Sequence, residues 1–517
     1  MNTLSRRRFL AATGGLAAAL PRRPAHAADM PRRGGVLRIS IDQAASVINP
    51  LLARVNPEYL VIDLLYSGLT RLTPQMAAEP DLASAWTADA TLTEWRFTLR
   101  QGVTFHDGTP CTAKDVVATF AAILDPKTAS PARTNVGPID SVTAADATTV
   151  VFRLKAPYAD LPVALGYTNA RIIPAAIAAG NPDRLSREAI GTGPFKLVSY
   201  EPDRRIVVAR NESYFDPRRP HVDRVEVVVY PDPTAEASAL LTGDTDLMAS
   251  TTPSEFPRLA DAAGVVALRI PSGQFLNVNM GCDQAPFRDV RVRQALALTV
   301  DRAALVGFVA QGYGTPGNDT PLSPAYRYYQ DMPLKQPDIA AARRLLAAAG
   351  HADGLDLTMI ASDTPSTRTQ LAVAMREMAK PAGLRITVQT MPHATYLAQV
   401  WKQGAFYVGF YNMQATADAI FSLLYTSTAA WPETRWNNPD FDRLVEAARV
   451  TTDAAKRRAL YGAAQTLMRD QVPSVIPVFF DLLAGRRDWV QGYVLHPRAS
   501  IFRLDEVWLT VAAPARG

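Results

Sequence analysis

The stretch Leu82–Phe120, LASAWTADATLTEWRFTLRQGVTFHDGTPCTAKDVVATF, decides the fold of this chain. Its segment Trp95–Leu99 alternates large apolar and polar residues, which is the period-2 pattern of a half-buried strand. Gly102 interrupts that pattern, Val103–Phe105 resumes it, and Asp107-Gly108 is a turn signal. The stretch therefore predicts a strand, a turn and a second strand.

A capped helix is predicted directly after this strand pair. Thr112 has the residue type preferred at an N-cap, and Asp115 stands three residues later, where its carboxylate can reach back to the cap. The apolar residues of Val116–Leu124 continue the helix.

The string Leu82–Val116 resembles, nearly residue for residue, the signature of the family 5 solute-binding proteins, which are periplasmic dipeptide, oligopeptide and nickel receptors of ABC transporters. Gly191–Phe215 and Phe287–Arg302 carry the same resemblance, which extends over nearly all of the mature chain. It implies an α/β, two-lobed periplasmic binding protein of the Venus-flytrap kind, with an extra subdomain in the first lobe and two hinge crossovers.

The first 27 residues have the features of a twin-arginine signal peptide. Ser5–Leu10 (SRRRFL) is the export motif, Ala11–Leu20 is an apolar segment too short to span a membrane, and Ala25-His26-Ala27 is a cleavage site. We therefore expect export by the twin-arginine pathway, cleavage after Ala27, and a soluble protein in the periplasm.

The charge of the chain comes from this leader. The sequence has 54 Lys and Arg against 49 Asp and Glu, a net charge of +5. Five of the arginines lie in the leader, which contains no acidic residue, so the remaining chain has no net charge. A neutral chain offers no general electrostatic attraction for nucleic acid or anionic membranes, and we expect neither as a partner.

The resemblance implies a division into two lobes. The first lobe comprises residues 28–270 and 481–517, with an inserted subdomain at roughly 51–170, and the second comprises 271–480. The chain is expected to cross between them near Pro271 and at Val475–Phe480. Further strands are predicted at Thr148–Leu154, Val225–Tyr230, Phe275–Met280, Leu355–Ala361, Leu384–Thr390 and Tyr407–Tyr411. Further helices are predicted from Phe287 to about Phe308 and at Ile339–Ala349, Thr367–Lys380, Asp440–Arg449 and Asp453–Arg469.

Motifs for catalysis are missing from the sequence. It has no G-x-S-x-G, no serine with a lysine at the third following position, and no phosphate-binding loop. The mature histidines are His106, His221, His351, His393 and His496, and no two have the spacing of a helical metal site. The two cysteines, Cys111 and Cys282, fall in different predicted lobes; a disulfide is one alternative in an oxidising compartment, and two free thiols are favoured. We expect no enzyme activity and no cofactor.

The resemblance also indicates where the ligand should bind. In the family, a loop after a second-lobe strand carries a Trp and, three residues later, an Asp that pairs with a peptide's α-amino group. Here Phe410 stands at the Trp position and Met413 at the Asp position. A thioether cannot balance an ammonium ion as a carboxylate does, which argues against a free-amine peptide as ligand.

Other residues of the same loop are candidates for the missing role. Tyr411 belongs to the same segment, and Asn412 offers a neutral donor and acceptor. Asp418 either takes over the charge or, as we favour, is structural. Candidates from cleft-facing positions of relatives are Asn49, Tyr66, Asn169, Arg171, Arg368 and Trp436. For Arg368 the alternatives are a ligand carboxylate and a solvated surface position, and for Trp436 they are the cleft and the core.

The predicted function is that of the substrate-binding component of an ABC importer. A peptide-like or other small polar solute would bind between the lobes of a monomer, and the closed form would dock on permease and ATPase subunits of the inner membrane. Alternatives are a receptor for a signalling or chemosensory partner, and a nickel-type metal-chelate receptor, although His393 is the only histidine near the cleft segments. A periplasmic enzyme on the same fold and a folding helper are further rivals.

Overall fold

The computed structural model describes residues 30–180 and 182–516. From Arg32 onwards the chain forms one compact unit. The predicted signal peptide at 1–27 lies outside the described residues. Within the described part, no helix is both long enough and apolar enough to cross a lipid bilayer.

A large mixed sheet of 11 strands has the order β15-β14-β16-β12-β17-β11-β1-β10-β9-β8, with β13 paired to β17. Parallel pairs such as β1–β10 and antiparallel pairs such as β12–β17 occur in it, which confirms the predicted α/β class. Its strands are β1 (Val36–Ile41), β8 (Phe195–Glu201), β9 (Arg205–Arg210), β10 (Arg224–Val229), β11 (Leu247–Met248), β12 (Val265–Met280), β13 (Gly314–Pro316), β14 (Leu355–Ser362), β15 (Leu384–Met391), β16 (Phe406–Tyr411) and β17 (Ser474–Arg487).

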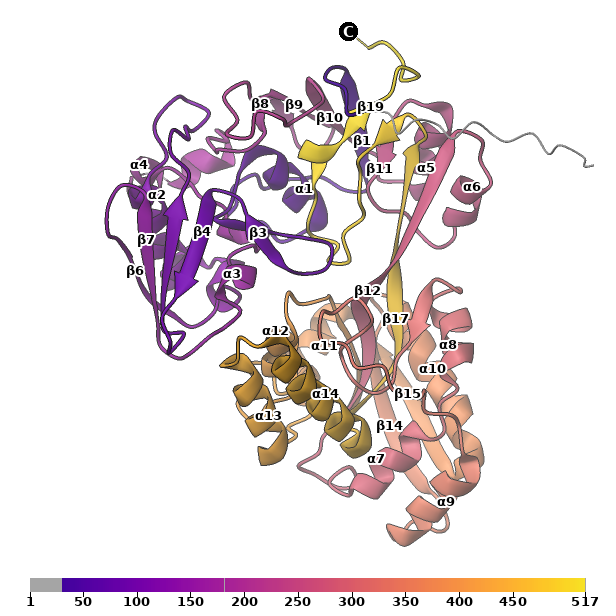
Figure 1. Ribbon diagram of the computed structural model, residues 1–517. Helices are drawn as coiled ribbons and strands as arrows, with labels where there is room; N and C mark the ends of the chain where they lie inside the picture. The colour runs from indigo at the N-terminus through magenta and orange to yellow at the C-terminus, as the bar shows by residue number, and fades with distance from the viewer. Residues whose placement is uncertain (1–29, 181, 517) are drawn as a thin grey trace, which may run out of the picture. The chain divides into compact units, whose positions relative to one another are not determined.

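The two long strands β12 and β17 lie side by side and connect two groups of strands (Figure 1). The first group is β11, β1, β10, β9 and β8, and the second group is β16, β14 and β15. One end of β17 pairs with β11 of the first group, and β12 pairs with β16 of the second. The predicted crossovers near Pro271 and at Val475–Phe480 fall within these strands. The register shifts between Pro271 and Gln274, so the ladder is interrupted where the chain passes between the groups.

A separate four-stranded antiparallel sheet contains the stretch that decides the fold. Its order is β4 (Ala83–Ala88), β5 (Glu94–Leu99), β7 (Thr149–Leu154) and β6 (Ile139–Ala144). Helix α2 (Ala113–Leu124) packs on it through Phe120, whose ring lies edge-on to that of Phe152 with centroids 4.9 Å apart. Phe152 in turn contacts Phe97 at 5.3 Å, so the apolar residues of the predicted strand form this core.

The cap of α2 is the predicted one. The backbone N–H and the hydroxyl of Thr112 donate to Asp115 Oδ2 at 2.7 and 3.0 Å. The predicted strand Val103–Phe105 is wrong, because only one isolated bridge, from Thr104 to Pro110, forms there. The carboxylate of Asp107 accepts two hydrogen bonds from Thr109, which closes a tight turn and leaves no room for a longer ladder.

A single helix is predicted from Phe287 to about Phe308, but the structure has two helices in this range. They are α7 (Val290–Ala297) and α8 (Arg302–Val309). Asp301 begins α8 as its N-cap, with Oδ1 accepting from the backbone of Ala304 at 2.9 Å. Arg302 then turns inwards to a buried ion pair with Asp319, 2.7 Å away.

The other elements are mostly short. The remaining helices are α1 (Asn56–Leu65), α3 (Leu161–Ala164), α4 (Ala175–Ala179), α5 (Pro233–Thr242), α6 (Phe256–Ala260), α9 (Ile339–Ala348), α10 (Thr367–Ala379), α11 (His393–Gln399), α12 (Ala417–Leu424), α13 (Pro439–Arg449) and α14 (Ala454–Gln471). Two small sheets pair β2 (Thr70–Leu72) with β3 (Ala78–Pro80) and β18 (Val490–Gln491) with β19 (Trp508–Leu509).

The motif Gly191-Thr192-Gly193 packs directly against the end of α1. A Cβ atom at Gly191 would lie 2.0 Å from the carbonyl oxygen of Leu65, and one at Gly193 would lie 2.3 Å from the carbonyl carbon of the same residue. The ring nitrogens of His106 lie 3.3 and 3.2 Å from the carbonyl oxygens of Ala189 and Gly193. This histidine therefore ties the Asp107 turn to the glycine motif.

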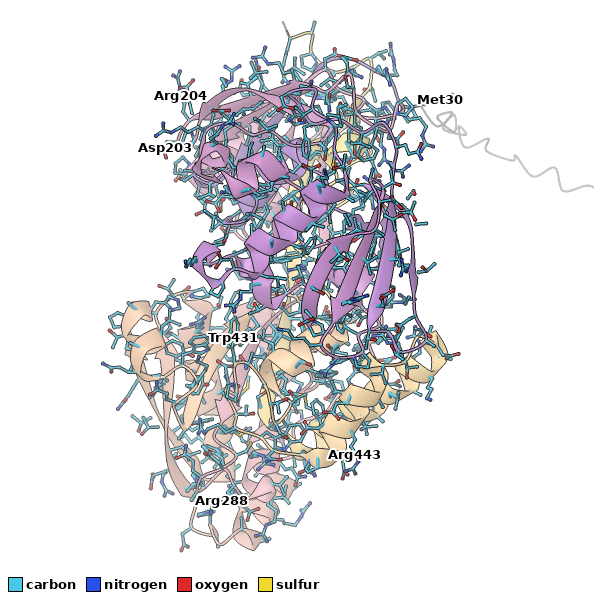
Figure 2. All side chains as sticks on the ribbon, turned by 90° about the vertical axis from the view of Figure 1, so that its left-hand side faces the viewer. Met30, Asp203, Arg204, Arg288, Trp431 and Arg443 are labelled. Carbon is cyan, nitrogen blue, oxygen red and sulfur yellow. The ribbon has the colours of Figure 1, made fainter. Side chains whose placement is uncertain are left out.

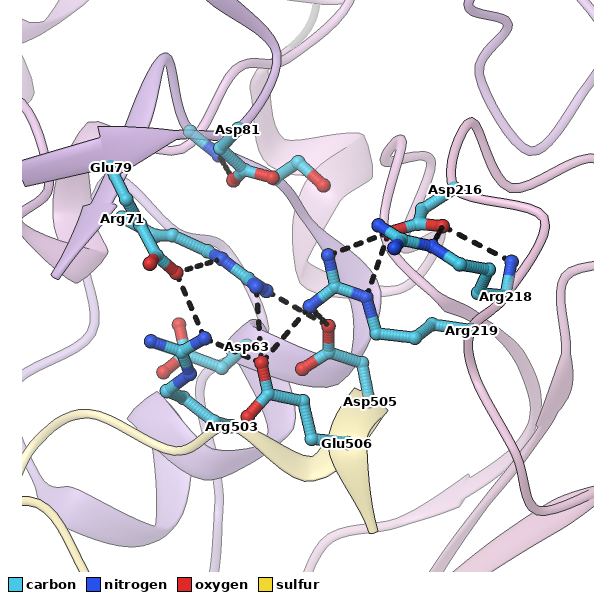
Figure 3. A network of polar contacts seen from close by, with 12 residues as sticks. Asp63, Arg71, Glu79, Asp81, Asp216, Arg218, Arg219, Arg503, Asp505 and Glu506 are labelled. Carbon is cyan, nitrogen blue, oxygen red and sulfur yellow. Dashed lines mark hydrogen bonds and ion pairs between the residues drawn. The ribbon is translucent and has the colours of Figure 1, made fainter. Parts of the chain in front are cut away.

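A network of ion pairs holds the C-terminal segment in place (Figure 3). Arg71 of β2 pairs with Asp505 and Glu506 at 2.9 and 3.1 Å, and Arg219 pairs with the same two acids at the same two distances. Arg219 also binds Asp216 at 2.7 Å. The opposite charges of this network neutralise one another within the fold.

Candidate functional site

A large cavity has a volume of about 640 Å³, within the range typical of small-molecule sites. On the side of the first group of strands, its wall includes residues of α1 and of the loops around Thr134 and Tyr167. On the side of the second group, it includes the Asn412 loop, α12 and Trp431. Ser272 and Gln274 of the hinge strand β12 complete it. The side chain of Trp431 lies where the N-terminal part of the chain faces the C-terminal helices (Figure 2). Segments far apart in sequence thus meet around one space.

The loop after β16 forms part of this wall. Gln274 Nε2 donates to Asn412 Oδ1 at 2.7 Å, which fixes the loop to the hinge strand β12. Gln414 donates its backbone N–H to the hydroxyl of Tyr326 at 2.9 Å. Between them Met413 is buried against Gly273, where a Cβ atom would lie 2.6 Å from the methionine Cγ. Only glycine fits this close approach.

The charged residues of the wall are three arginines, Arg54, Arg449 and Arg498, and one acid, Asp418. Asp418 Oδ1 lies 2.9 Å from Arg449 Nε. Burial raises the pKa of Asp418 above its usual value, while Arg449 opposes that shift. Since this pair is neutral overall, the cavity has an excess of positive charge.

Arg498 contributes to that excess. Its guanidinium carbon lies 4.6 Å from the ring centroid of Tyr167, a cation–π distance. Only 8% of the residue is exposed, and within the described residues no carboxylate lies within ion-pair distance of it.

A second cavity of about 290 Å³ shares Asn56, Gln274, Leu482 and Ala499 with the first and has the opposite charge. Asp42, Glu236 and Asp481 line it, and none of its described wall residues is a lysine or arginine. Asp481 pairs with Arg269 at 2.6 Å, and Arg269 itself is not part of the described wall. Burial raises the pKa of Glu236 to about 7. Beyond the paired residues, the described walls thus contribute Arg54 and Arg498 to the first cavity, and Asp42 and Glu236 to the second.

Residues 77–432 match the model of the bacterial extracellular solute-binding proteins, family 5, over more than half of the chain. This chain is a family 5 solute-binding protein. The resemblance seen in Leu82–Phe120 is confirmed. The family consists of substrate-binding receptors and not of enzymes.

Relatives of this family 5 protein bind different ligands. Heme-binding protein A of Haemophilus influenzae is 31% identical over 459 residues, which cover 81% of this chain and 82% of that protein. Glutathione-binding protein GsiB of Escherichia coli is 26% identical over 476 residues, covering 89% and 92%. The substrate-binding protein CtaP of Listeria monocytogenes has a similar structure, with a TM-score of 0.81 and 25% identity over 92% of this chain and 100% of that one. The two-lobed fold is therefore shown, whereas the ligand differs between relatives.

Three of the predicted site residues of this family 5 protein line the large cavity: Asn412, Met413 and Asp418. Contact between these residues and a ligand stays a prediction. The neighbouring Phe410 packs against Phe480 with centroids 6.3 Å apart, and Tyr411 accepts a hydrogen bond from Trp401 Nε1 at 3.2 Å. Neither of these two aromatic residues lines the two cavities described above.

The first-group candidates line neither of the two cavities described above, and their roles in binding stay predictions. Asn49 Oδ1 accepts from the backbone of Leu51 at 3.0 Å, and Asn169 Nδ2 donates to the carbonyls of Pro50 and Ala53 at 2.8 and 2.9 Å. Tyr66 instead borders a small cavity of about 30 Å³ beside the network of Figure 3, and its hydroxyl has no partner among the described residues. Arg171 Nη2 pairs with Asp63 at 2.7 Å in the same region.

The remaining candidates, Arg368 and Trp436, are buried away from both cavities. Arg368 lies over the rings of Tyr396 and Phe410, 5.3 and 5.9 Å from their centroids. Trp436 packs on Phe441 at 5.0 Å in the core of the second group. Roles of these two residues in binding stay predictions, and these contacts match the core alternative for Trp436.

Sequence reasoning missed several wall residues. Gln274, Tyr167 and Trp431 are ordinary residues of strand, turn and loop, and nothing in their local pattern distinguishes them. Arg498 also lacks a distinguishing signal, because the same C-terminal tail contains the charged residues Arg503, Asp505 and Glu506.

Within the described residues, no group of three or more His, Cys, Asp or Glu side chains is arranged to hold a metal ion. His393 hydrogen-bonds to the Ser362 hydroxyl at 2.9 Å. Cys111 and Cys282 are free thiols, and burial raises the pKa of Cys282 to about 11.

Proposed function

We propose that this protein is the substrate-binding component of an ABC importer and captures a peptide-like or other small polar solute. The observation that carries the proposal is the cavity of about 640 Å³, whose wall combines residues on both sides of the hinge strands β12 and β17. A ligand there touches both lobes, so closure around it removes water from every polar contact.

The proposed lobes are residues 28–270 with 481–517, including the insertion at roughly 51–170, and residues 271–480. Motion between them would occur at the register shift beside Gln274, where the β12–β17 ladder is interrupted. A ligand shifts the population of open and closed forms only by its preference for the closed one.

Among the ligands of the relatives, a solute of the glutathione type suits the charge of the wall. Of its described charged residues, Asp418 is paired with Arg449, which leaves Arg54 and Arg498 for the carboxylates of a polar solute. Amides and tyrosines of the same wall offer further hydrogen bonds to such a solute.

The proposed role implies a cellular location and a set of partner subunits. The protein would be exported through the twin-arginine pathway, cleaved after Ala27, and act in the periplasm as a monomer. Permease and ATPase subunits in the inner membrane would complete the importer.

Calorimetry on the protein without residues 1–27 tests the proposal. Glutathione and a set of di- and tripeptides should bind and should raise the melting temperature, because a ligand that binds only the folded state stabilises it. Ala419→Trp fills the large cavity from α12 and should abolish binding, whereas Ala341→Trp, also half-buried but on α9, should not. Binding of heme or a nickel chelate alone, or peptide binding that survives Ala419→Trp, would contradict it.

A further inference from the structure

Six arginines are less than 9% exposed in the described structure, and they differ in how their charge is satisfied. Three have carboxylate partners at 2.7 Å or closer, and Arg293 donates to several backbone carbonyls. The three pairs are Arg171–Asp63, Arg302–Asp319 and Arg457–Asp160. A buried charge without such partners is costly, so the remaining two deserve an explanation.

Arg368 and Arg498 are the two exceptions, and only Arg498 reaches a cavity. Arg368 is enclosed by the rings of Tyr396 and Phe410 and borders neither large cavity. Arg498 touches one ring, that of Tyr167, and otherwise faces the large cavity. Within the described residues its guanidinium has no ion pair and no hydrogen bond to the protein.

The backbone of Arg498 is held in place independently of its side chain. His496 Nδ1 accepts from the Arg498 N–H at 3.1 Å, while Nε2 donates to the carbonyl of Thr73 at 3.0 Å. Burial lowers the pKa of His496 to about 4, so this tautomer is neutral at pH 7. The loop is therefore rigid before any ligand arrives, which reduces the entropy lost on binding.

We propose that Arg498 binds a carboxylate of the transported solute in the large cavity. The inference rests on the proposed function and narrows it to anionic or dipolar solutes. A guanidinium offers two parallel N–H groups that match a carboxylate, and that of Arg498 lies 4.6 Å from the ring centroid of Tyr167. The ligand thus supplies the negative partner that the fold gives to Arg171, Arg302 and Arg457.

The test compares Arg498→Gln with Arg457→Gln, which removes a buried arginine that has a protein partner. Without ligand, Arg498→Gln should keep the melting temperature of the wild type, whereas Arg457→Gln should lower it. With a panel of tripeptides as free acids and as C-terminal amides, Arg498→Gln should weaken binding of the free acids at least tenfold and leave the amides within twofold. Arg498→Lys should recover part of the loss.

Simple anions separate failure of this inference from failure of the proposed function. Citrate and succinate are titrated into wild type and Arg498→Gln while tryptophan fluorescence is followed, since Trp431 lies in the cavity wall. Arg498-dependent binding of these anions without peptide binding keeps the inference and refutes a peptide-like solute. The inference is overturned if no anion binds, if acids and amides lose equal affinity, or if Arg498→Gln unfolds as readily as Arg457→Gln.

Discussion

Asp418 and Arg449 form an ion pair in the wall of the large cavity, with Oδ1 2.9 Å from Nε. The pair joins the first turn of α12 to the last turn of α13, and Arg449 Nη2 also donates to Ser422 at 2.7 Å. Asp418, the one acid among the described wall residues, is therefore already neutralised by the protein. It is poorly placed to replace the amine-binding aspartate that the family has at the position of Met413.

Asp418→Asn should therefore lower stability more than ligand binding. The side chain of Asp418 is buried, but that of Arg449 is 28% exposed, so we expect a loss of about 2 kcal/mol, below the range for fully buried pairs. Urea unfolding measures this loss of unfolding free energy. Adding Arg449→Gln to the Asp418→Asn variant should cause little further loss. Unchanged stability with lost peptide binding would instead identify Asp418 as a ligand-binding residue.

Gly193→Ala should prevent folding or lower stability severely. Its Cβ would lie 2.3 Å from the backbone of Leu65, and backbone at the end of a buried helix cannot move aside. Gly307 on α8 is a matched control, because no atom lies within 4 Å of its added Cβ. Gly307→Ala should raise stability by up to about 1 kcal/mol through helix propensity. Thermal unfolding of both variants tests this prediction. A stably folded Gly193→Ala protein would contradict the close approach of Gly193 to the backbone of Leu65.

The local part of the fold could be predicted from sequence, and the long-range part only through the resemblance. Period-2 alternation at Trp95–Leu99 and the cap at Thr112 depend only on residues that are neighbours in the chain. Both can therefore be recognised from the local sequence. The break between α7 and α8 was missed because the residues before Asp301 remain apolar, and burial of Arg302 against Asp319 depends on a contact 17 residues away.

The candidate site was predicted less completely for the same reason. The Asn412–Asp418 loop was found because a family position marks it. Arg498 lies 80 residues beyond Asp418 and reaches the cavity only through the return of the chain along β17. Asn49 and Asn169 line neither cavity: Asn49 Oδ1 accepts from the backbone of Leu51 in its own loop, and Asn169 Nδ2 donates to two backbone carbonyls of that loop.

Glu236 should make stability depend on pH. Burial and the nearby Asp42 raise its pKa from 4.5 to about 7, while hydrogen bonding to Ser40 opposes the shift. The folded protein therefore holds this proton more tightly than the unfolded chain, and its stabilising effect is present below about pH 4.5 and lost as pH rises to about 7. The change corresponds to roughly 3 kcal/mol.

Glu236→Gln removes that dependence. The difference in unfolding free energy between variant and wild type should therefore grow in favour of the variant from pH 4.5 to pH 8. The other ionisable wall groups of the smaller cavity are Asp42, which lies close enough to raise the pKa of Glu236, Asp481, which Arg269 pairs, and His496, whose pKa burial lowers to about 4, together with Tyr313 and Tyr493. A difference that stays flat with pH would show that Glu236 is ionised in the folded protein at pH 5.

Met413→Asp tests whether the departure from the family pattern sets the ligand. The new carboxylate would replace a side chain that is only 4% exposed and that lies against Gly273. We expect a loss of about 2–4 kcal/mol, since burying an unpaired polar group is costly. A peptide's α-amino group would supply the missing charge, so free-amine peptides should stabilise this variant more than their N-acetylated forms.

Met413→Leu is the matched control, because it keeps the volume and lacks the charge, and such swaps change stability by less than about 1.5 kcal/mol. Wild type and Met413→Leu should not prefer free amines, whereas Met413→Asp should, by at least tenfold in calorimetry. A wild-type preference for free amines as strong as that of Met413→Asp would place amine recognition elsewhere in the cleft, and the acidic wall around Glu236 would then be the first place to mutate.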